Sequence, residues 1–122
     1  MFLQRAAFAG RRYLTTMSQS MTPMEDALRA KITDALEPTT LQIFNDSHKH
    51  AHHKAMQGST SRETHFRVVI TSSAFQGKMQ VARHRMVNSL MKDEMAQEGG
   101  IHALQLTTRT PEEEEARKQR DL

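Results

Sequence analysis

The chain has 122 residues, of which 37% are hydrophobic and 25% charged, with nine methionines and no cysteine. This length accommodates one small domain with extensions. The absence of cysteine excludes disulfides, thiolate metal sites and a cysteine nucleophile, and no stretch reaches the ~18 apolar residues of a membrane-spanning helix, so we expect no membrane association.

The net charge of +3 comes from the N-terminal segment. Lysine and arginine number 17 and exceed the 14 acidic residues by three. Arg5, Arg11 and Arg12 lie in the first 24 residues, where there is no acidic residue. The remainder of the chain is therefore formally neutral, which weakens any argument for general electrostatic attraction to nucleic acid.

Residues 1–20 have the composition of a mitochondrial transit peptide, because they combine arginines with apolar residues, serine and threonine and lack acids. A disordered tail is the alternative. We expect import into the mitochondrial matrix, with cleavage near Tyr13 or Leu14. Initiation at Met17 or Met21 would leave an untargeted, cytosolic form. The folded domain is expected over residues 21–122.

The first half of this domain predicts a helix, a strand and a long loop. Thr22-Pro23-Met24-Glu25 has the pattern of a capping box with proline at the first helical position. A helical apolar face then follows, and Glu37-Pro38 ends the helix. Residues 41–44 alternate as a short strand. Residues 46–62 are polar and predict a long loop, which in a small domain is usually functional or disordered.

The second half predicts a strand over residues 65–71, a helix over 81–96, a strand over 101–108 and a helix over 111–120. Gly99-Gly100 stops the second helix, and Thr110-Pro111-Glu112-Glu113 repeats the capping-box pattern. The predicted order is α-β-β-α-β-α. We therefore expect an α+β fold with a three-stranded mixed sheet and helices packed on one face.

Residues 47–53, Ser-His-Lys-His-Ala-His-His, contain four of the seven histidines of the chain. We call this segment the His tract. Histidine is the commonest metal ligand among side chains, although such a tract can also be a solvated loop that binds metal adventitiously. The isolated His65, His84 and His102 are more often packing or hydrogen-bonding residues. No hydrolase, phosphate-binding or paired-carboxylate motif occurs, so we expect a binding or transfer protein and no enzyme.

Several motifs together resemble the BolA family, in order and in spacing. They are Ser72-Ser73-Ala74-Phe75-Gln76-Gly77, then Arg83-His84-Arg85-Met86-Val87, then Gly100-Ile101-His102-Ala103-Leu104. Glu63-Thr64-His65-Phe66-Arg67-Val68 is similar to the first long strand of that family, and Asn45-Asp46-Ser47 to its approach to the loop. The resemblance covers about residues 22–115, and the N-terminal segment points to the mitochondrial members.

The resemblance implies an α+β fold related to KH domains and a [2Fe–2S] cluster shared with a monothiol glutaredoxin and its glutathione. In the family, the histidine that corresponds to His102 ligates the cluster. The second ligand comes from the loop, where the family spacing points to His50. The loop is longer here than is usual in the family, and His48, His52 and His53 are alternatives to His50.

The donor set agrees with this implication. Two histidines can replace two cysteines on one iron of a [2Fe–2S] centre. A chain without cysteine must obtain thiolates from a partner, and a monothiol glutaredoxin with glutathione would supply two. Histidine ligation is pH-dependent and exchangeable, which suits a carrier that delivers clusters to [4Fe–4S] client proteins.

Lys78, Arg83, His84 and Arg85 form a small basic group at the start of the second predicted helix. They could dock a partner or solvate the helix, and we expect partner docking. The KH-like shape raises an alternative function, that of a nucleic-acid-binding transcriptional regulator, but the Gly-x-x-Gly clamp of such domains is absent before this helix. A zinc or copper buffer acting through the His tract is a third hypothesis. The sequence leaves open a weak homodimer.

Overall fold

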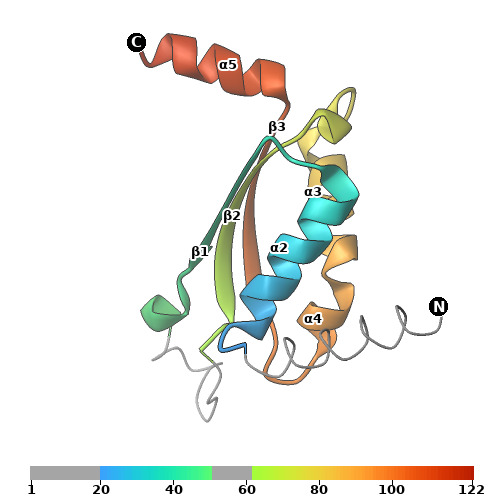
Figure 1. Cartoon of the computed structure of the whole chain (residues 1–122), viewed down its shortest axis with the longest axis vertical. Helices are drawn as coiled ribbons and strands as arrows, with labels where there is room; N and C mark the ends of the chain where they lie inside the picture. The colour runs from blue at the N-terminus through green and yellow to red at the C-terminus, as the bar shows by residue number, and fades with distance from the viewer. Residues whose placement is uncertain (1–19, 51–61) are drawn as a thin grey trace, which may run out of the picture.

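The computed structural model describes residues 20–50 and 62–122, with the backbone alone at Lys49 and His50. The predicted transit segment 1–19 and the tract residues His52 and His53 lie outside the described residues. The elements are α2 (Pro23–Leu36), β1 (Thr40–Asn45), the 3-10 helix η1 (Ser47–His50), β2 (His65–Thr71), the 3-10 helix η3 (Ser73–Phe75), α3 (Gln80–Leu90), α4 (Lys92–Ala96), β3 (Ala103–Arg109) and α5 (Pro111–Arg120) (Figure 1).

The sheet has the order β1-β2-β3 and is mixed, as predicted. β1 and β2 pair antiparallel, with Asn45 opposite Phe66. β2 and β3 pair parallel, with His65 opposite Ala103 and Thr71 opposite Arg109. The helical crossover α3–α4 joins these two parallel strands, as a β-α-β connection requires. Helices α2, α3 and α4 lie on one face of the sheet (Figure 1).

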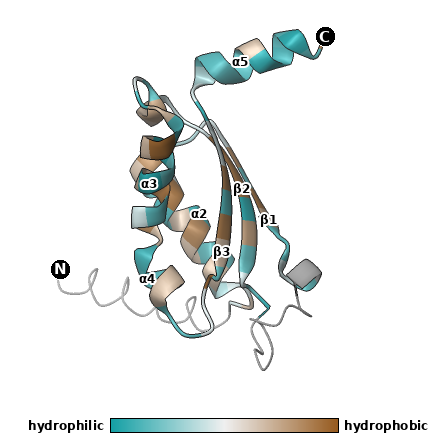
Figure 2. Cartoon of the chain, turned by 180° about the vertical axis from the view of Figure 1, so that it is seen from behind, coloured by the Kyte–Doolittle hydropathy of each residue, from teal (hydrophilic) through white to brown (hydrophobic). Residues whose placement is uncertain are grey.

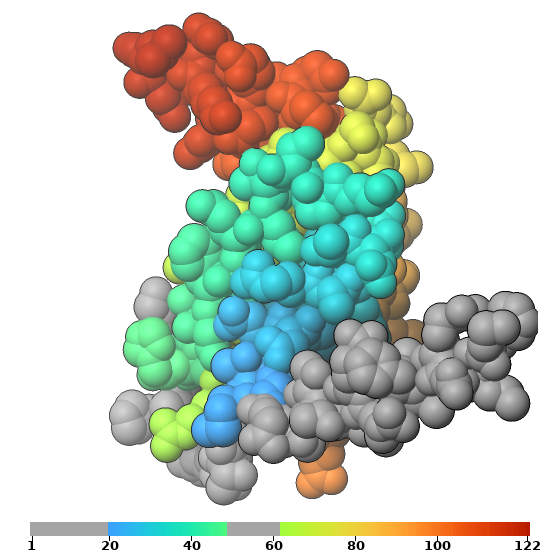
Figure 3. Space-filling model, viewed as in Figure 1, coloured from blue at the N-terminus to red at the C-terminus, as the bar shows by residue number. Residues whose placement is uncertain are grey.

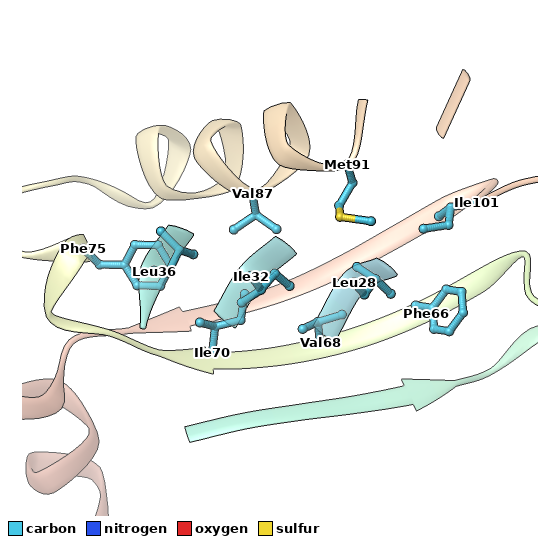
Figure 4. Packing of buried hydrophobic residues seen from close by; sticks show 10 residues of the cluster. All are labelled: Leu28, Ile32, Leu36, Phe66, Val68, Ile70, Phe75, Val87, Met91 and Ile101. Carbon is cyan, nitrogen blue, oxygen red and sulfur yellow. The ribbon is translucent and has the colours of Figure 1, made fainter. Parts of the chain in front are cut away.

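The core lies between this helical layer and the sheet. Alternate residues of β2 face the helices, because successive side chains of a strand point to opposite faces. α2 contributes residues four apart in the sequence, which share one helix face. Figure 2 shows that both layers carry hydrophobic residues, and Figure 4 shows the buried side chains between them at close range. The buried set comprises Leu28, Ile32, Leu36, Phe66, Val68, Ile70, Phe75, Val87, Met91 and Ile101.

The N-terminus of α2 differs from the sequence prediction. Thr22 is the N-cap residue but its side chain makes no capping hydrogen bond, so the predicted capping box is wrong here. The buried carboxylate of Glu63 replaces it: it accepts hydrogen bonds from the backbone N–H groups of Met24 (3.1 Å) and Glu25 (3.0 Å). A carboxylate is favourable at this position because unsatisfied N–H groups and the helix dipole make a helix N-terminus positive.

The helix predicted over residues 81–96 is two helices. It is interrupted at Met91, whose φ of −101° and ψ of 17° are not helical. Met91 itself is fully buried, and the short α4 that follows is tied to α2 by an ion pair of 2.8 Å between Lys31 and Glu94. The break turns the chain toward the start of β3.

The last helix, α5, begins with the predicted capping box, formed by Thr110 and Glu113. None of its residues is buried, and it projects from one end of the molecule (Figure 3). It therefore differs from the other helices, which cover the sheet. Within the described residues, no helix has both the length and the apolar character needed to cross a membrane.

Candidate functional site

The two ends of the segment that contains the His tract are fastened by one residue, Asn45. Its side-chain amide donates to the backbone carbonyl of Arg62 (2.9 Å). Its side-chain carbonyl accepts from the backbone N–H of Ser47 (3.0 Å). The chain therefore leaves the end of β1 and returns at the same place, beside the start of β2.

Ser47 joins the beginning of the tract to β2. Its hydroxyl oxygen accepts hydrogen bonds from the backbone N–H groups of Thr64 (2.8 Å) and His65 (3.2 Å). Ser47 and Thr64 are both buried. A hydrogen bond in the protein interior is electrostatically stronger than one in water, so these bonds hold the two residues in place. The first turn of the tract, η1, is thus held against the N-terminal end of β2.

Thr64 carries the connection onward to His102. Its carbonyl oxygen accepts from the backbone N–H groups of His102 (2.6 Å) and Ala103 (3.0 Å). Its hydroxyl lies 2.9 Å from Nδ1 of His65. The rings of His65 and His102 have centroids 5.6 Å apart, with an angle of 39° between their planes. The side chain of His102 is exposed and that of His65 half-buried.

The approach to His102 is set by a tight turn after α4. The backbone N–H of Ile101 donates to the carbonyl of Glu94 (2.9 Å), and that of Gly100 to the carbonyl of Gln97 (2.9 Å). A Cβ atom at position 100 would lie 2.2 Å from the Glu94 carbonyl oxygen. Glycine is therefore required at this position for steric reasons. Ile101, the residue before His102, is buried in the core and holds the chain there.

This end of the sheet presents the imidazoles of His65 and His102 next to Ser47, the first residue of the His tract. Among the described residues no group of three or more His, Asp or Glu side chains is placed to hold a metal ion. A metal ion held here by three or more such side chains would therefore need donors from beyond the described residues.

The structure places the predicted metal ligands as follows. His102 is exposed immediately before β3, and His48 is exposed in η1. His50 is the last residue of η1, three positions after the anchoring Ser47. The side chains of His50, His52 and His53 lie outside the described ones, so the choice of His50 over His48, His52 and His53 as a ligand stays a prediction.

The basic group lies at the other end of the sheet, and Arg83 is not on the surface. Its guanidinium donates to Glu113 (2.7 and 3.0 Å) and to the carbonyls of Lys78 (2.8 Å) and Thr108 (3.2 Å), and its side chain is 6% exposed. The prediction that Arg83 docks a partner is therefore corrected: its charge is used inside the fold. Lys78 and Arg85 are exposed and His84 is half-buried.

The ion pair of Arg83 also changes the acid strength of its partner. Hydrogen bonds from Arg83 and from the backbone N–H of Thr110 lower the pKa of Glu113 from 4.5 to about 2. A second pair, between Arg109 and Glu114 (3.1 Å), lies beside it. Together these pairs fasten α5 to α3 and β3 at the C-terminal edge of the sheet, one strand length or roughly 20 Å from His102.

An open groove between α3, β3 and α5 also lies at this edge. Its polar lining includes His84, Arg109, Arg117 and Arg120, together with Glu113. Arg109 is paired with Glu114, and Arg117 lies 4.0 Å from Asp121. The positive charge of the groove is thus largely compensated, and nothing here strengthens the nucleic-acid hypothesis.

Sequence reasoning missed His65 as a member of this site. A signal was available, because the predicted order strand–helix–strand implies two parallel strands, and the starts of parallel neighbours lie at the same edge. His65 begins one of these strands and His102 precedes the other. The residue that links them, Thr64, offers no comparable signal, because its role depends on its carbonyl oxygen and on burial.

Comparison with known proteins gives consistent results. A family model described as BolA-like protein matches residues 32–113. The chain is 44% identical over 105 residues to the UV-induced protein uvi31 of Schizosaccharomyces pombe, which covers 84% of this chain and 96% of that protein. It is 42% identical over 88 residues to the chloroplastic/mitochondrial SufE-like protein 1 of Arabidopsis thaliana, where the match covers 70% of this chain and 23% of that protein.

The solved structures give the same fold. BolA1 from Arabidopsis thaliana superposes with a TM-score of 0.62 at 42% identity, over 72% of this chain and 92% of that one. The predicted α+β architecture is thereby confirmed.

Proposed function

Because the chain belongs to the BolA family, we propose that it is a mitochondrial iron–sulfur cluster assembly factor. In this proposal it holds a [2Fe–2S] cluster together with a monothiol glutaredoxin and its glutathione, and assists delivery of the cluster to [4Fe–4S] client proteins. The cluster is cargo for the protein, which binds and transfers it without catalysing a reaction.

The proposed ligands on this chain are His102 and one histidine of the tract, with His50 preferred to His48, His52 and His53. The observation that supports the proposal is the exposed imidazole of His102, whose backbone is joined through Thr64 to Ser47 at the start of the His tract. Two imidazoles on one iron match the ligand set of Rieske-type centres. The thiolates that such a cluster still requires would come from the glutaredoxin cysteine and from glutathione.

The partner must therefore approach the N-terminal edge of β2 and β3. Lys78, His84 and Arg85 remain proposed partner contacts, but they lie at the opposite edge. A glutaredoxin bound at His102 reaches them only if it extends along the strand length of roughly 20 Å. This separation makes them outlying contacts, which affect the rate of association more than the chemistry of the cluster.

We propose the mitochondrial matrix as the location. The arginine-rich, acid-free composition of residues 1–20 supports this proposal. One relative is named as chloroplastic/mitochondrial, which agrees with an organellar location. Analysis of the N-terminus of protein isolated from mitochondria tests it: cleavage near residue 13 or 14 is expected, and retention of Met1 in matrix protein would contradict the transit-peptide assignment.

The test of the function is a titration of a cluster-loaded monothiol glutaredoxin with the purified protein, followed by visible absorption and circular dichroism. We expect the spectrum to change toward that of a mixed histidine and thiolate cluster. His102→Ala should abolish the change, whereas Glu115→Gln, which alters an exposed side chain of α5 at the other end of the sheet, should preserve it. An unchanged spectrum with the wild-type chain would overturn the proposal.

The choice among the tract histidines is tested in the same titration by four single His→Gln variants. Replacement of His50 should have the largest effect. Equal effects of all four would show that the tract supplies exchangeable ligands and would contradict the preference for His50.

A further inference from the structure

Two histidines far apart in the sequence meet at the N-terminal edge of the parallel strands. His65 is the first residue of β2 and His102 immediately precedes β3. Their ring centroids are 5.6 Å apart. Two imidazoles on one tetrahedral metal ion, with metal–nitrogen distances of about 2.1 Å, have ring centres about 5 Å apart. The observed separation is therefore close to that of two imidazoles on one metal ion.

The ring of His65 already has the kind of support that metal-ligating histidines have. Its Nδ1 lies 2.9 Å from the Thr64 hydroxyl. A hydrogen bond at one ring nitrogen fixes the ring orientation and directs coordination to the other nitrogen. In His65 that other nitrogen is Nε2.

The backbone of both histidines is fixed by the same buried residue. Thr64, which is 3% exposed, accepts hydrogen bonds from the N–H groups of His102 and Ala103 through its carbonyl oxygen. Its own N–H, like that of His65, is bound by the hydroxyl of Ser47. None of these bonds involves an imidazole of the tract, so they hold the backbone of both residues independently of the tract histidines.

We propose that His65 and His102 together bind a divalent transition-metal ion of the Zn²⁺ or Co²⁺ type, without the histidines of the tract. Water, or the thiolates of a partner, completes the coordination, since a tetrahedral ion has two further positions. The proposal shares His102 with the proposed function but requires neither a cluster nor a glutaredoxin. It also gives His65 a metal-binding role that the sequence motifs did not assign to it.

The test uses the full chain with His48, His50, His52 and His53 all replaced by Gln, titrated with Co²⁺ and followed by visible absorption. We expect saturable binding of one ion per chain, with bands typical of low-symmetry coordination. Adding His65→Gln or His102→Gln should weaken Co²⁺ binding at least tenfold. Loss of a hydrogen bond that supports a ligand already weakens metal binding by about 10–100-fold, and loss of the ligand itself should cost no less. Adding Glu115→Gln, which alters an exposed side chain of α5, is the control and should leave binding unchanged.

Thr64→Val tests the supporting hydrogen bond, because it removes the hydroxyl and keeps the shape and the backbone carbonyl. In the same tract-free background it should weaken Co²⁺ binding by about 10–100-fold. Far-ultraviolet circular dichroism checks that each variant is folded. For any variant that does not fold, Zn²⁺ titration of the wild-type chain by NMR replaces it, and the ring resonances of His65 and His102 should shift together.

Loss of all Co²⁺ binding in the tract-free chain would overturn this inference and would indicate a buffer acting through the tract alone. Equal binding by the tract-free chain and by its His65→Gln derivative would overturn it as well. Neither result bears on the glutaredoxin titration, where the readout is the spectrum of the shared cluster and the decisive variant is His102→Ala. Failure of the two proposals is therefore distinguishable.

Discussion

Arg83 illustrates how burial changes the meaning of a charged residue. The sequence predicts Arg83 to be part of an exposed basic group. In the structure its guanidinium points inward and donates hydrogen bonds to Glu113 and to two backbone carbonyls. A guanidinium offers five donors in a planar fork, which suits several acceptors at once. The neighbouring Arg85 remains exposed. Two arginines two positions apart thus have different roles.

Replacing Arg83 should therefore destabilise the protein, while replacing Arg85 should not. Arg83→Met removes the charged hydrogen bonds and leaves the Thr108 carbonyl with one donor fewer, at a cost of about 2 kcal/mol in free energy of unfolding. Arg85→Met should stay within about 0.5 kcal/mol of wild type. Urea unfolding measures both variants. Equal stabilities would contradict the structural role of Arg83.

The ion pair between Arg83 and Glu113 should also make the stability of the protein depend on pH. The pKa of Glu113 is lowered from 4.5 to about 2 in the folded protein, so the unfolded chain takes up a proton first as the pH falls. The stabilisation by the carboxylate is complete above about pH 4.5 and is lost as the pH falls toward 2. Because the side chain is 48% exposed, solvent screening limits the effect to no more than about 1 kcal/mol.

Glu113→Gln should accordingly remove part of the acid sensitivity. The difference in free energy of unfolding between wild type and variant should shrink as the pH is lowered from 6 to about 2. Glu115→Gln is the control, since Glu115 contacts Gln119 within its own helix. A difference that stays constant with pH would refute the assignment of the low pKa to Glu113.

At the level of elements, hydrophobic periodicity was sufficient to predict a helix or strand where one face of the element is buried. The alternation of residues 65–71 predicts β2 with its observed bounds, because Phe66, Val68 and Ile70 all enter the core. The helix over 81–96 was predicted without its interruption. Val87 and Glu94 continue the buried face on both sides of the break at Met91, so the hydrophobic pattern alone gives no sign of it.

The N-terminal caps of α2 and α5 also show what a local sequence pattern cannot predict. Both sequences fit a capping box, but only Thr110 forms one. At α2 the acceptor is Glu63, 38 positions from Glu25 in the sequence. A local pattern cannot anticipate a tertiary contact of this kind, because the competing carboxylate is brought to the helix by the start of β2.

The turn between α4 and β3 gives a prediction for an element boundary. Gly100→Ala would bring a Cβ atom within 2.2 Å of the Glu94 carbonyl oxygen, so the backbone before His102 must move, at a cost of about 2–3 kcal/mol. At Gly99, where φ is +76° and no atom lies within 4 Å of the added Cβ, alanine should cost about 1 kcal/mol through backbone strain alone.

Thermal and urea unfolding of the two alanine variants compare these costs. Co²⁺ binding by Gly100→Ala should also weaken, since His102 follows this turn directly. An alanine at position 100 that is tolerated as well as one at position 99 would show that the tight turn is not required.

At the level of the whole molecule, the fold separates two regions that the sequence presents together. His65 and His102 lie at the N-terminal ends of the parallel strands beside Ser47, the first residue of the tract. At the opposite end, His84 lines the groove with Arg109 and α5, and Arg83 binds the carbonyls of Lys78 and Thr108. Figure 1 shows α5 at that end of the sheet. The family motifs correctly indicated the α+β fold, and the assignment of His102 as a metal ligand stays a prediction. They could not indicate Thr64 and Ser47, whose hydroxyl and carbonyl groups hold the site only once the strands have paired.

The most direct measurement of the central claim is pulsed electron paramagnetic resonance of the reduced complex with glutaredoxin. Only this chain, and not the glutaredoxin, is labelled with nitrogen-15. Any hyperfine coupling between the label and the cluster must therefore come from ligands that this chain supplies. We predict couplings typical of two imidazole nitrogens on one iron, and loss of the coupling from position 102 in His102→Ala. A complex whose cluster shows no coupling to the labelled chain would contradict histidine ligation by this protein.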